Sequence, residues 1–192
     1  GSTSKLFTAT LVLDLVATGE LGLDDTVGEH LGGLPAWADE VTVDQLLHHT
    51  AAIPDYIDLL YDQGYVDADR TTVDDALDAL ATVDLEGRPG ARFSYSNSGY
   101  LLLAEIVEAV TGREVADVMA ERVFARYDLD AVLDPVPDDP RRASSYVRRD
   151  GGWVVADTRW EQVGDGAVQT TPTELVRWAS ELWEPRPPAV VG

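Results

Sequence analysis

Two long apolar segments with helical spacing constrain this chain more than any other feature of its sequence. Residues 5–18 carry apolar side chains at helix-like intervals, namely Leu6, Phe7, Leu11, Leu13, Leu15 and Val16, and Gly19 follows as a stop signal. Residues 98–110, "SGYLLLAEIVEAV", are strongly apolar and are followed by Thr111 and Gly112. Because the first segment is apolar on nearly all sides, it predicts a helix packed between other layers of the fold.

Shorter helices are predicted from capping signatures and amphipathic spacing. Thr42, with Gln45 three residues on, has the pattern of a capping box that opens a short helix. Thr171, followed by Pro172 and Glu174, marks the start of a later helix. The segments "TTVDDALDALATVDL" and "REVADVMAERVFARY" predict two more helices.

Strand signals are few. Alternating residues around Asp-Gly-Gly in "ASSYVRRDGGWVVA" predict a β-hairpin over 143–158, and Phe93–Tyr95 predicts a short extended piece inside a loop. Two segments, "GELGLDDTVGEHLGGLP" and "DLDAVLDPVPDDPRR", are predicted to be loops, and "GDGAVQ" a glycine turn. The sequence therefore predicts a helix-rich α+β chain with too few strands for an independent sheet layer.

The charge and composition exclude several classes of partner and site. Thirty-five acids against fourteen bases give a net charge of -21, which repels nucleic acid and anionic membranes. The chain has no run of the roughly 20 apolar residues needed to span a membrane, and no basic segment precedes the first apolar helix as in a signal peptide. There is no cysteine, so neither a disulfide nor a thiolate metal site can form.

Ser2 and Lys5, the only lysine of the chain, form one candidate site. Residues three apart on a helix share a face, with Cβ atoms roughly 5–6 Å apart. A serine at a helix start lies at the positive end of the helix dipole, and a desolvated lysine beside it can accept the hydroxyl proton. Spacing alone equally fits a serine or threonine that caps the helix beside a solvated lysine.

Tyr95 and Asn97, in "YSNSGY", form a second candidate pair. In an extended segment their side chains point the same way, because side chains alternate with period two. A phenol can relay a proton, and a carboxamide can hold a substrate carbonyl or a lysine amine. The pattern also fits a packed Tyr95 and an Asn97 that caps the following helix.

The order of the motifs is more specific than any one of them. The chain carries "GSTSKLFTA", "LLHHTAAIPDY", "GARFSYSNSGYLLLAEIVEAVTG" and "GDGAVQTTPTELVRWASELW" in that order. This set resembles the serine β-lactamase and penicillin-binding-protein superfamily, in particular its class C-like branch with D-alanyl-D-alanine carboxypeptidases and related esterases. The resemblance implies the nucleophile helix and helical domain of a β-lactamase-like fold, an α/β sheet plus an all-α part, with most of the sheet absent.

The resemblance also implies a site and a reaction. Ser2 would be the acylated nucleophile, Lys5 its proton partner, Tyr95 the proton shuttle and Asn97 a hydrogen-bond partner of Lys5 and substrate. Either Lys5 or Tyr95 can be the general base, since the two titrate as a pair. The substrate would be a D-amino-acid peptide, a β-lactam or an ester, with no metal or other cofactor, and the location secreted or cell-envelope.

Some expectations concern the extent of the chain and its other residues. The superfamily's third motif, Lys-Thr-Gly or His-x-Gly, is not found after Trp183, so we expect an internal segment that is by itself a weak catalyst or none. The predicted parts of this single incomplete domain, 1–192, are 1–18 (nucleophile helix), 20–142 (helical region), 143–158 (hairpin), 164–184 (return helix) and 185–192 (tail). His30, His48 and His49 lack metal-site spacing, and Asp55 and Tyr56 fit a cleft rim or an ordinary loop.

Two other functions stay open from the sequence. One is a non-catalytic ligand-sensing or interaction module on the same scaffold, which would bind a ligand or stay acylated. The other is a structural helical fragment that needs a completing segment or a second copy of the chain to cover its apolar surface.

Overall fold

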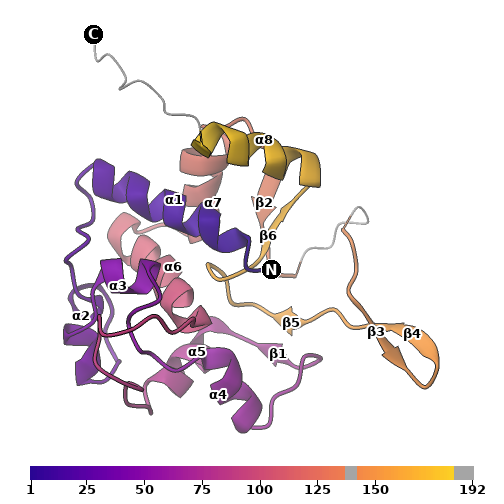
Figure 1. The fold of residues 1–192 in the computed structure, drawn as a ribbon, viewed down its shortest axis with the longest axis horizontal. Helices are drawn as coiled ribbons and strands as arrows, with labels where there is room; N and C mark the ends of the chain where they lie inside the picture. Colours follow the sequence, from indigo (N-terminus) through magenta and orange to yellow (C-terminus); the bar gives the residue numbers. More distant parts are fainter. Residues whose placement is uncertain (137–141, 184–192) are drawn as a thin grey trace.

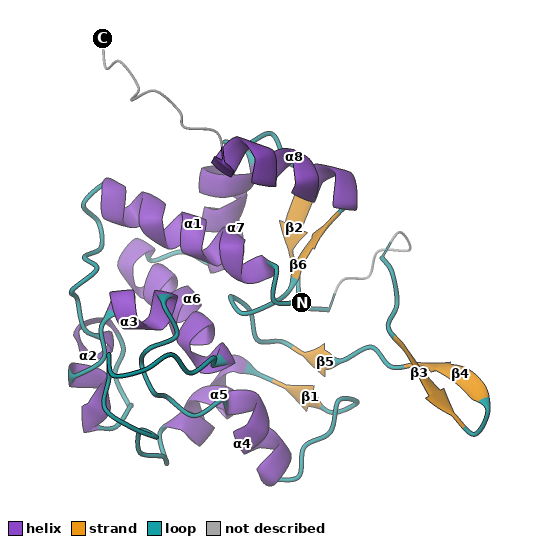
Figure 2. Cartoon of the chain, viewed as in Figure 1, coloured by secondary structure: helices purple, strands orange, loops and turns teal. Residues whose placement is uncertain are grey.

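The computed structural model describes residues 1–136 and 142–183, and its helices surround one buried central helix (Figures 1 and 2). The helices are α1 (Ser4–Ala17), α2 (Val27–His30), α3 (Val43–Leu47), α4 (Tyr56–Asp62), α5 (Val73–Leu80), α6 (Asn97–Thr111), α7 (Val115–Met119) and α8 (Pro172–Trp183), with a short 3₁₀ helix η1 (Ala36–Asp39) and a short π-helix η2 (Ala120–Phe124). The strands are β1 (Arg70–Thr71), β2 (Ala131–Leu133), β3 (Tyr146–Arg149), β4 (Gly152–Val155), β5 (Arg159–Trp160) and β6 (Val168–Thr170).

The central helix is α6, which contacts α1, α2, α3, α4 and α7. Its apolar run from Leu101 to Ala104 is fully buried, which explains why polar residues are scarce in this segment. Gly112 ends the helix in the left-handed conformation, with φ of 66°, as glycine commonly does after a helix. The predicted helix over 98–110 is thus confirmed, and it begins at Asn97, which is partly buried.

The first helix, α1, packs against α6 through one side and against α8 through another. Phe7 stacks face to face on Trp178 with ring centroids 3.9 Å apart, and both rings are buried. Leu6 and Leu13 remain 53% and 50% exposed. The segment is therefore buried on the sides that face α6 and α8 but not on all sides.

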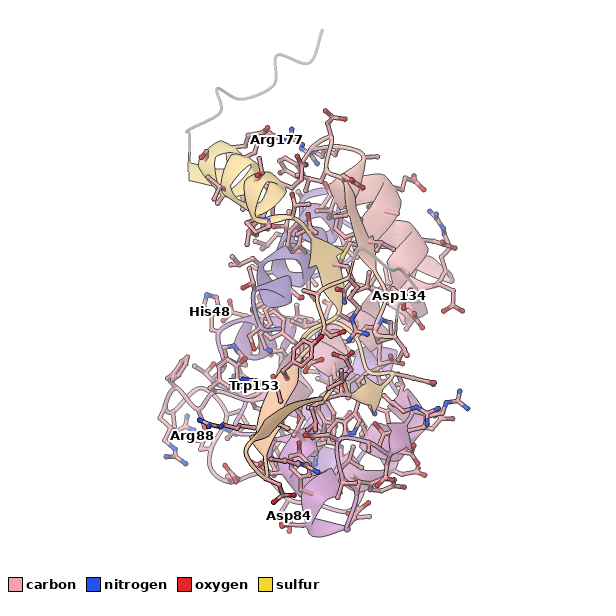
Figure 3. The ribbon with its side chains drawn as sticks, turned by 90° about the vertical axis from the view of Figure 1, so that its right-hand side faces the viewer. His48, Asp84, Arg88, Asp134, Trp153 and Arg177 are labelled. Atoms are coloured by element: carbon pink, nitrogen blue, oxygen red, sulfur yellow. The ribbon has the colours of Figure 1, made fainter. Side chains whose placement is uncertain are left out.

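Three separate two-stranded sheets account for the described strands. The antiparallel β3 and β4 form the predicted hairpin, which projects from the body of the molecule with Trp153 at its exposed face (Figures 1 and 3). β2 pairs antiparallel with β6, and β1 pairs parallel with β5. No independent sheet layer forms within residues 1–136 and 142–183, as the sparse strand signals predicted.

Local signals located some elements well and missed others. Thr42 and Gln45 form the predicted capping box of α3, and the Thr171 hydroxyl accepts the backbone N–H of Glu174 at the start of α8. The predicted loops were wrong at α2 and β2, and α4 was not predicted. β2 depends on its distant partner β6, whereas α2 begins with a capping box of Thr26 and Glu29 and α4 with an N-cap at Asp55, which are local signals. The return helix begins at Pro172, because residues 168–170 pair with β2 instead. The predicted tail, 185–192, lies outside the described residues.

Candidate active site

Ser2 lies in the turn that leads into α1. The backbone N–H of Lys5 donates to the carbonyl of Ser2 at 3.1 Å, and Thr3, the residue before the helix, makes no side-chain cap. The hydroxyl of Ser2 instead lies 2.7 Å from the phenol oxygen of Tyr95. Capping of α1 therefore does not occupy this hydroxyl, and it is paired with a group that can exchange a proton.

Lys5 is buried next to this pair, with only 5% of its surface exposed. Its Nζ donates to Oδ1 of Asn97 at 2.7 Å and to the backbone carbonyl of Asp165 at 2.8 Å, and it lies 3.4 Å from Oγ of Ser2. The same nitrogen is 5.0 Å from the ring centroid of Tyr95. These contacts fix the amine in one place, and the reading of Lys5 as a solvated surface residue is wrong.

The imidazole of His49 packs against the ring of Tyr95 and positions it. The two rings stack with centroids 4.5 Å apart, while about half of Tyr95 remains exposed. Nδ1 of His49 accepts the backbone N–H of Ser96, and burial lowers the pKa of His49, which favours the neutral ring that such a bond requires. His49 itself has φ of 55°, a conformation that the sequence pattern did not indicate.

All four residues predicted from the sequence come together at one point. Asn97 is the first residue of α6, and its carboxamide bonds to Lys5 and Asp55 rather than serving as a helix cap. A hydroxyl, a phenol, an amine and a carboxamide thus meet where the starts of α1 and α6 approach each other. Such a cluster can take a proton from an alcohol and deliver it to a leaving group.

A loop far along the chain completes the enclosure of Lys5. Gly164 accepts a hydrogen bond from the hydroxyl of Thr8 at 2.7 Å, and the N–H of Val168 donates to Oγ of Ser4 at 3.1 Å. The carboxylate of Asp165 accepts the phenol proton of Tyr56 at 3.2 Å. The sequence predicted only a glycine turn for this segment. Its Gly-Asp-Gly pattern was the one signal that its backbone could approach another element closely.

Asp165 is a buried carboxyl group at the edge of the site. Burial raises its pKa from 3.8 to about 6, Lys5 and the bond from Tyr56 oppose this rise, and Asp55 adds to it. Burial likewise raises the pKa of Tyr56, which keeps this phenol a donor toward Asp165. Ionisation of Asp165 is therefore less favourable in the folded chain than in the unfolded one.

This difference predicts a pH-dependent stability. Since the folded pKa exceeds the unfolded value, the native state loses stability as Asp165 ionises between about pH 4 and about pH 6. Asp165→Asn cannot ionise and so avoids that loss. The free energy of unfolding of the variant, taken relative to that of the native chain, should therefore rise by up to about 3 kcal/mol between about pH 4 and about pH 7. Urea unfolding at several pH values measures this difference, and a flat or falling difference would contradict it.

The histidines occupy three different environments. His30 contacts Asp25, and His49 stacks on Tyr95. His48 is exposed at the surface (Figure 3) and contacts Asp44. Within the described ranges, no group of three or more histidine, aspartate or glutamate side chains is placed to bind a metal ion. In the same part of the chain, no helix has the length and apolar character to cross a membrane.

The fold and the clustered residues define the class of this protein as the serine β-lactamase and penicillin-binding-protein superfamily. Within it, the chain belongs to the Beta-lactamase family, whose model matches residues 1–190. The resemblance found in the sequence motifs is thereby confirmed, as is the helix-rich α+β fold.

Characterised relatives give the family its context. The chain is 38% identical over 195 residues to Penicillin-binding protein 4 of Amycolatopsis lactamdurans, covering 93% of this chain and 49% of that protein. It is 30% identical over 189 residues to a D-aminopeptidase of Brucella anthropi, covering 92% of this chain and 34% of that protein. The crystal structure of a penicillin binding protein from Bacillus halodurans superposes with a TM-score of 0.81 at 26% identity, covering 95% of this chain and 57% of that one. The chain thus spans about half or less of the length of these curated relatives.

Proposed function

We propose that this protein is a serine acyl-transfer hydrolase that acts through an acyl-enzyme on Ser2. The observation that carries the proposal is the 2.7 Å contact between the hydroxyls of Ser2 and Tyr95, next to the buried amine of Lys5. An exposed serine paired in this way can lose its proton as it attacks a carbonyl carbon, which is the requirement for nucleophilic catalysis.

The geometry supports a role for each residue. Oγ of Ser2 bonds to the carbonyl carbon while its proton passes to the Tyr95 and Lys5 pair and then to the departing nitrogen or oxygen. Asn97 holds Lys5 in place through the 2.7 Å bond to Oδ1. Water then attacks the acyl ester and gives one proton to the Tyr95 and Lys5 pair. The bond between the acyl carbon and Oγ of Ser2 breaks, the pair passes this proton to Oγ, and the acid leaves.

The substrate class follows from the reaction and the relatives. A penicillin-binding protein and a D-aminopeptidase are among the relatives. We therefore propose a D-amino-acid peptide, a β-lactam or an ester as substrate.

Covalent labelling tests the proposal. A fluorophosphonate, and separately a labelled penicillin, should each add one adduct to the purified chain, and peptide mass spectrometry should place it on Ser2. Ser4, two residues away and buried, is the internal comparison and should stay unlabelled, and Ser2→Ala should remove the adduct. An adduct elsewhere, or none with either reagent, would refute the proposal; a penicillin adduct that never hydrolyses would favour a sensing role.

A further inference from the structure

Asp55 connects the starts of two helices at the edge of the candidate site. One of its oxygens, Oδ1, accepts the backbone N–H of Ile57 at 3.0 Å and so caps α4. The other, Oδ2, accepts both the backbone N–H of Asn97 at 2.9 Å and its side-chain Nδ2 at 2.8 Å. Three donors thus converge on a single half-buried carboxylate.

This carboxylate determines which way the carboxamide of Asn97 faces. An ionised carboxylate only accepts hydrogen bonds, so the NH₂ end of Asn97 must face Asp55. The oxygen end is then directed at Nζ of Lys5, 2.7 Å away. The reversed carboxamide would set its NH₂ group against the amine of Lys5 and its oxygen against the carboxylate, and both contacts would be unfavourable.

We propose that Asp55 is a positioning residue for acyl transfer, acting through Asn97 to hold Lys5 beside Ser2. This inference rests on the proposed function, because it concerns the rate at which Ser2 is acylated. Asp55 makes no hydrogen bond to Ser2, Lys5 or Tyr95 among the contacts of the described residues. Its effect on the reaction therefore runs through the orientation of one carboxamide.

Asp55→Asn is the informative substitution. Asparagine has nearly the same shape and is as good a helix N-cap as aspartate, so α4 keeps its cap through the remaining oxygen. The new NH₂ group then faces the side chain of Asn97 and favours the reversed carboxamide, which presents its NH₂ to Lys5, while the backbone N–H of Asn97 loses its acceptor. Asp58→Asn, in the exposed first turn of the same helix, is the matched control because it removes the same charge.

The experiment follows the reaction of fluorophosphonate with Ser2 by intact-mass spectrometry over time. It yields the maximal inactivation rate and the half-saturating probe concentration, with the rate normalised to the fraction of folded protein found in thermal melts. Asp55→Asn should lower the maximal inactivation rate by about 10–100-fold, the range seen when the hydrogen-bond partner that orients a metal-binding side chain is removed. The half-saturating probe concentration should not change, because Asp55 does not touch the probe. Asp58→Asn should stay within about twofold of the native rate.

A double-mutant cycle shows whether Asp55 acts through Asn97. The pair Asp55→Asn with Asn97→Ala should react about as fast as Asn97→Ala alone, since residues acting through one contact are not additive. If the native chain is labelled on Ser2 and Asp55→Asn keeps its rate, or if the two effects multiply, the role of Asp55 is refuted while the proposed function stands. If the native chain is not labelled on Ser2, the proposed function itself fails.

Discussion

Replacement of Lys5 by methionine is expected to slow acylation of Ser2 by about 10²–10⁴-fold, the usual contribution of a positioned proton-transfer group. Methionine keeps most of the buried apolar volume but removes the amine that bonds Asn97 and the carbonyl of Asp165. In the proposed mechanism, the Tyr95 and Lys5 pair that takes the proton of Ser2 then loses one of its two members, whose Nζ lies 5.0 Å from the ring centroid of Tyr95. The rate is measured by labelling with fluorophosphonate, quenching samples at several times and determining the labelled fraction by intact-mass spectrometry.

Lys5→Arg separates proton transfer from charge. Arginine remains positively charged but does not give up its proton in proteins, so it should also lose most of the rate if Lys5 takes part in proton transfer. Arg126→Met, which removes an exposed cation from the surface, is the control and should leave the rate unchanged. A Lys5→Arg variant within tenfold of the native rate would show that only the charge matters.

Gly164→Ala is expected to destabilise the chain by about 2–5 kcal/mol, from left-handed backbone strain and overpacking together. Gly164 has φ of +94°, and an added Cβ would fall 2.3 Å from the carbonyl oxygen of Tyr100 and 2.8 Å from Cβ of Ala104. Both obstacles belong to the buried helix α6, one of them to its backbone, so they have little room to move. The melting temperature should fall by roughly 4–20 °C for a chain of this size.

Gly166→Ala is the matched control for this prediction. It lies in the same loop, but an added Cβ there meets nothing within 4 Å. Its free energy of unfolding should therefore stay within about 1 kcal/mol of the native value. Equal melting temperatures for the two variants would show that the loop does not press against α6, and would weaken the case that this loop fixes Lys5 through Asp165.

Local sequence signals accounted for much of the fold. The apolar spacing before Gly19 and Gly112 located α1 and α6, and the Thr42 and Gln45 pair located the start of α3. These signals depend on contacts within about four residues along the chain, so they can be recognised without knowledge of the tertiary structure. The β-hairpin was found for the same reason, because its turn and both its strands are adjacent in sequence.

Elements stabilised by distant partners were missed. β2 forms because Ala131–Leu133 pairs with Val168–Thr170. The residues around each segment give no indication that the two segments pair. Asp55 was read as a cleft-rim or loop residue, whereas it caps α4 and binds Asn97. The sequence pattern indicated only a turn at Asp165. The tertiary structure shows that its backbone carbonyl accepts a hydrogen bond from Lys5 and its carboxylate accepts one from Tyr56.

By itself, the sequence determined the two apolar helices, their ends, the order of the motifs and the identity of four candidate residues. Only the tertiary structure decided that the Ser2 hydroxyl faces Tyr95 rather than capping α1, and that Lys5 is buried. The physical reason is that helix formation depends on neighbours a few residues away, whereas this cluster exists because α1, α6 and a loop some 160 residues from Lys5 pack together. That packing buries an amine whose hydrogen bonds must then be satisfied from within the fold.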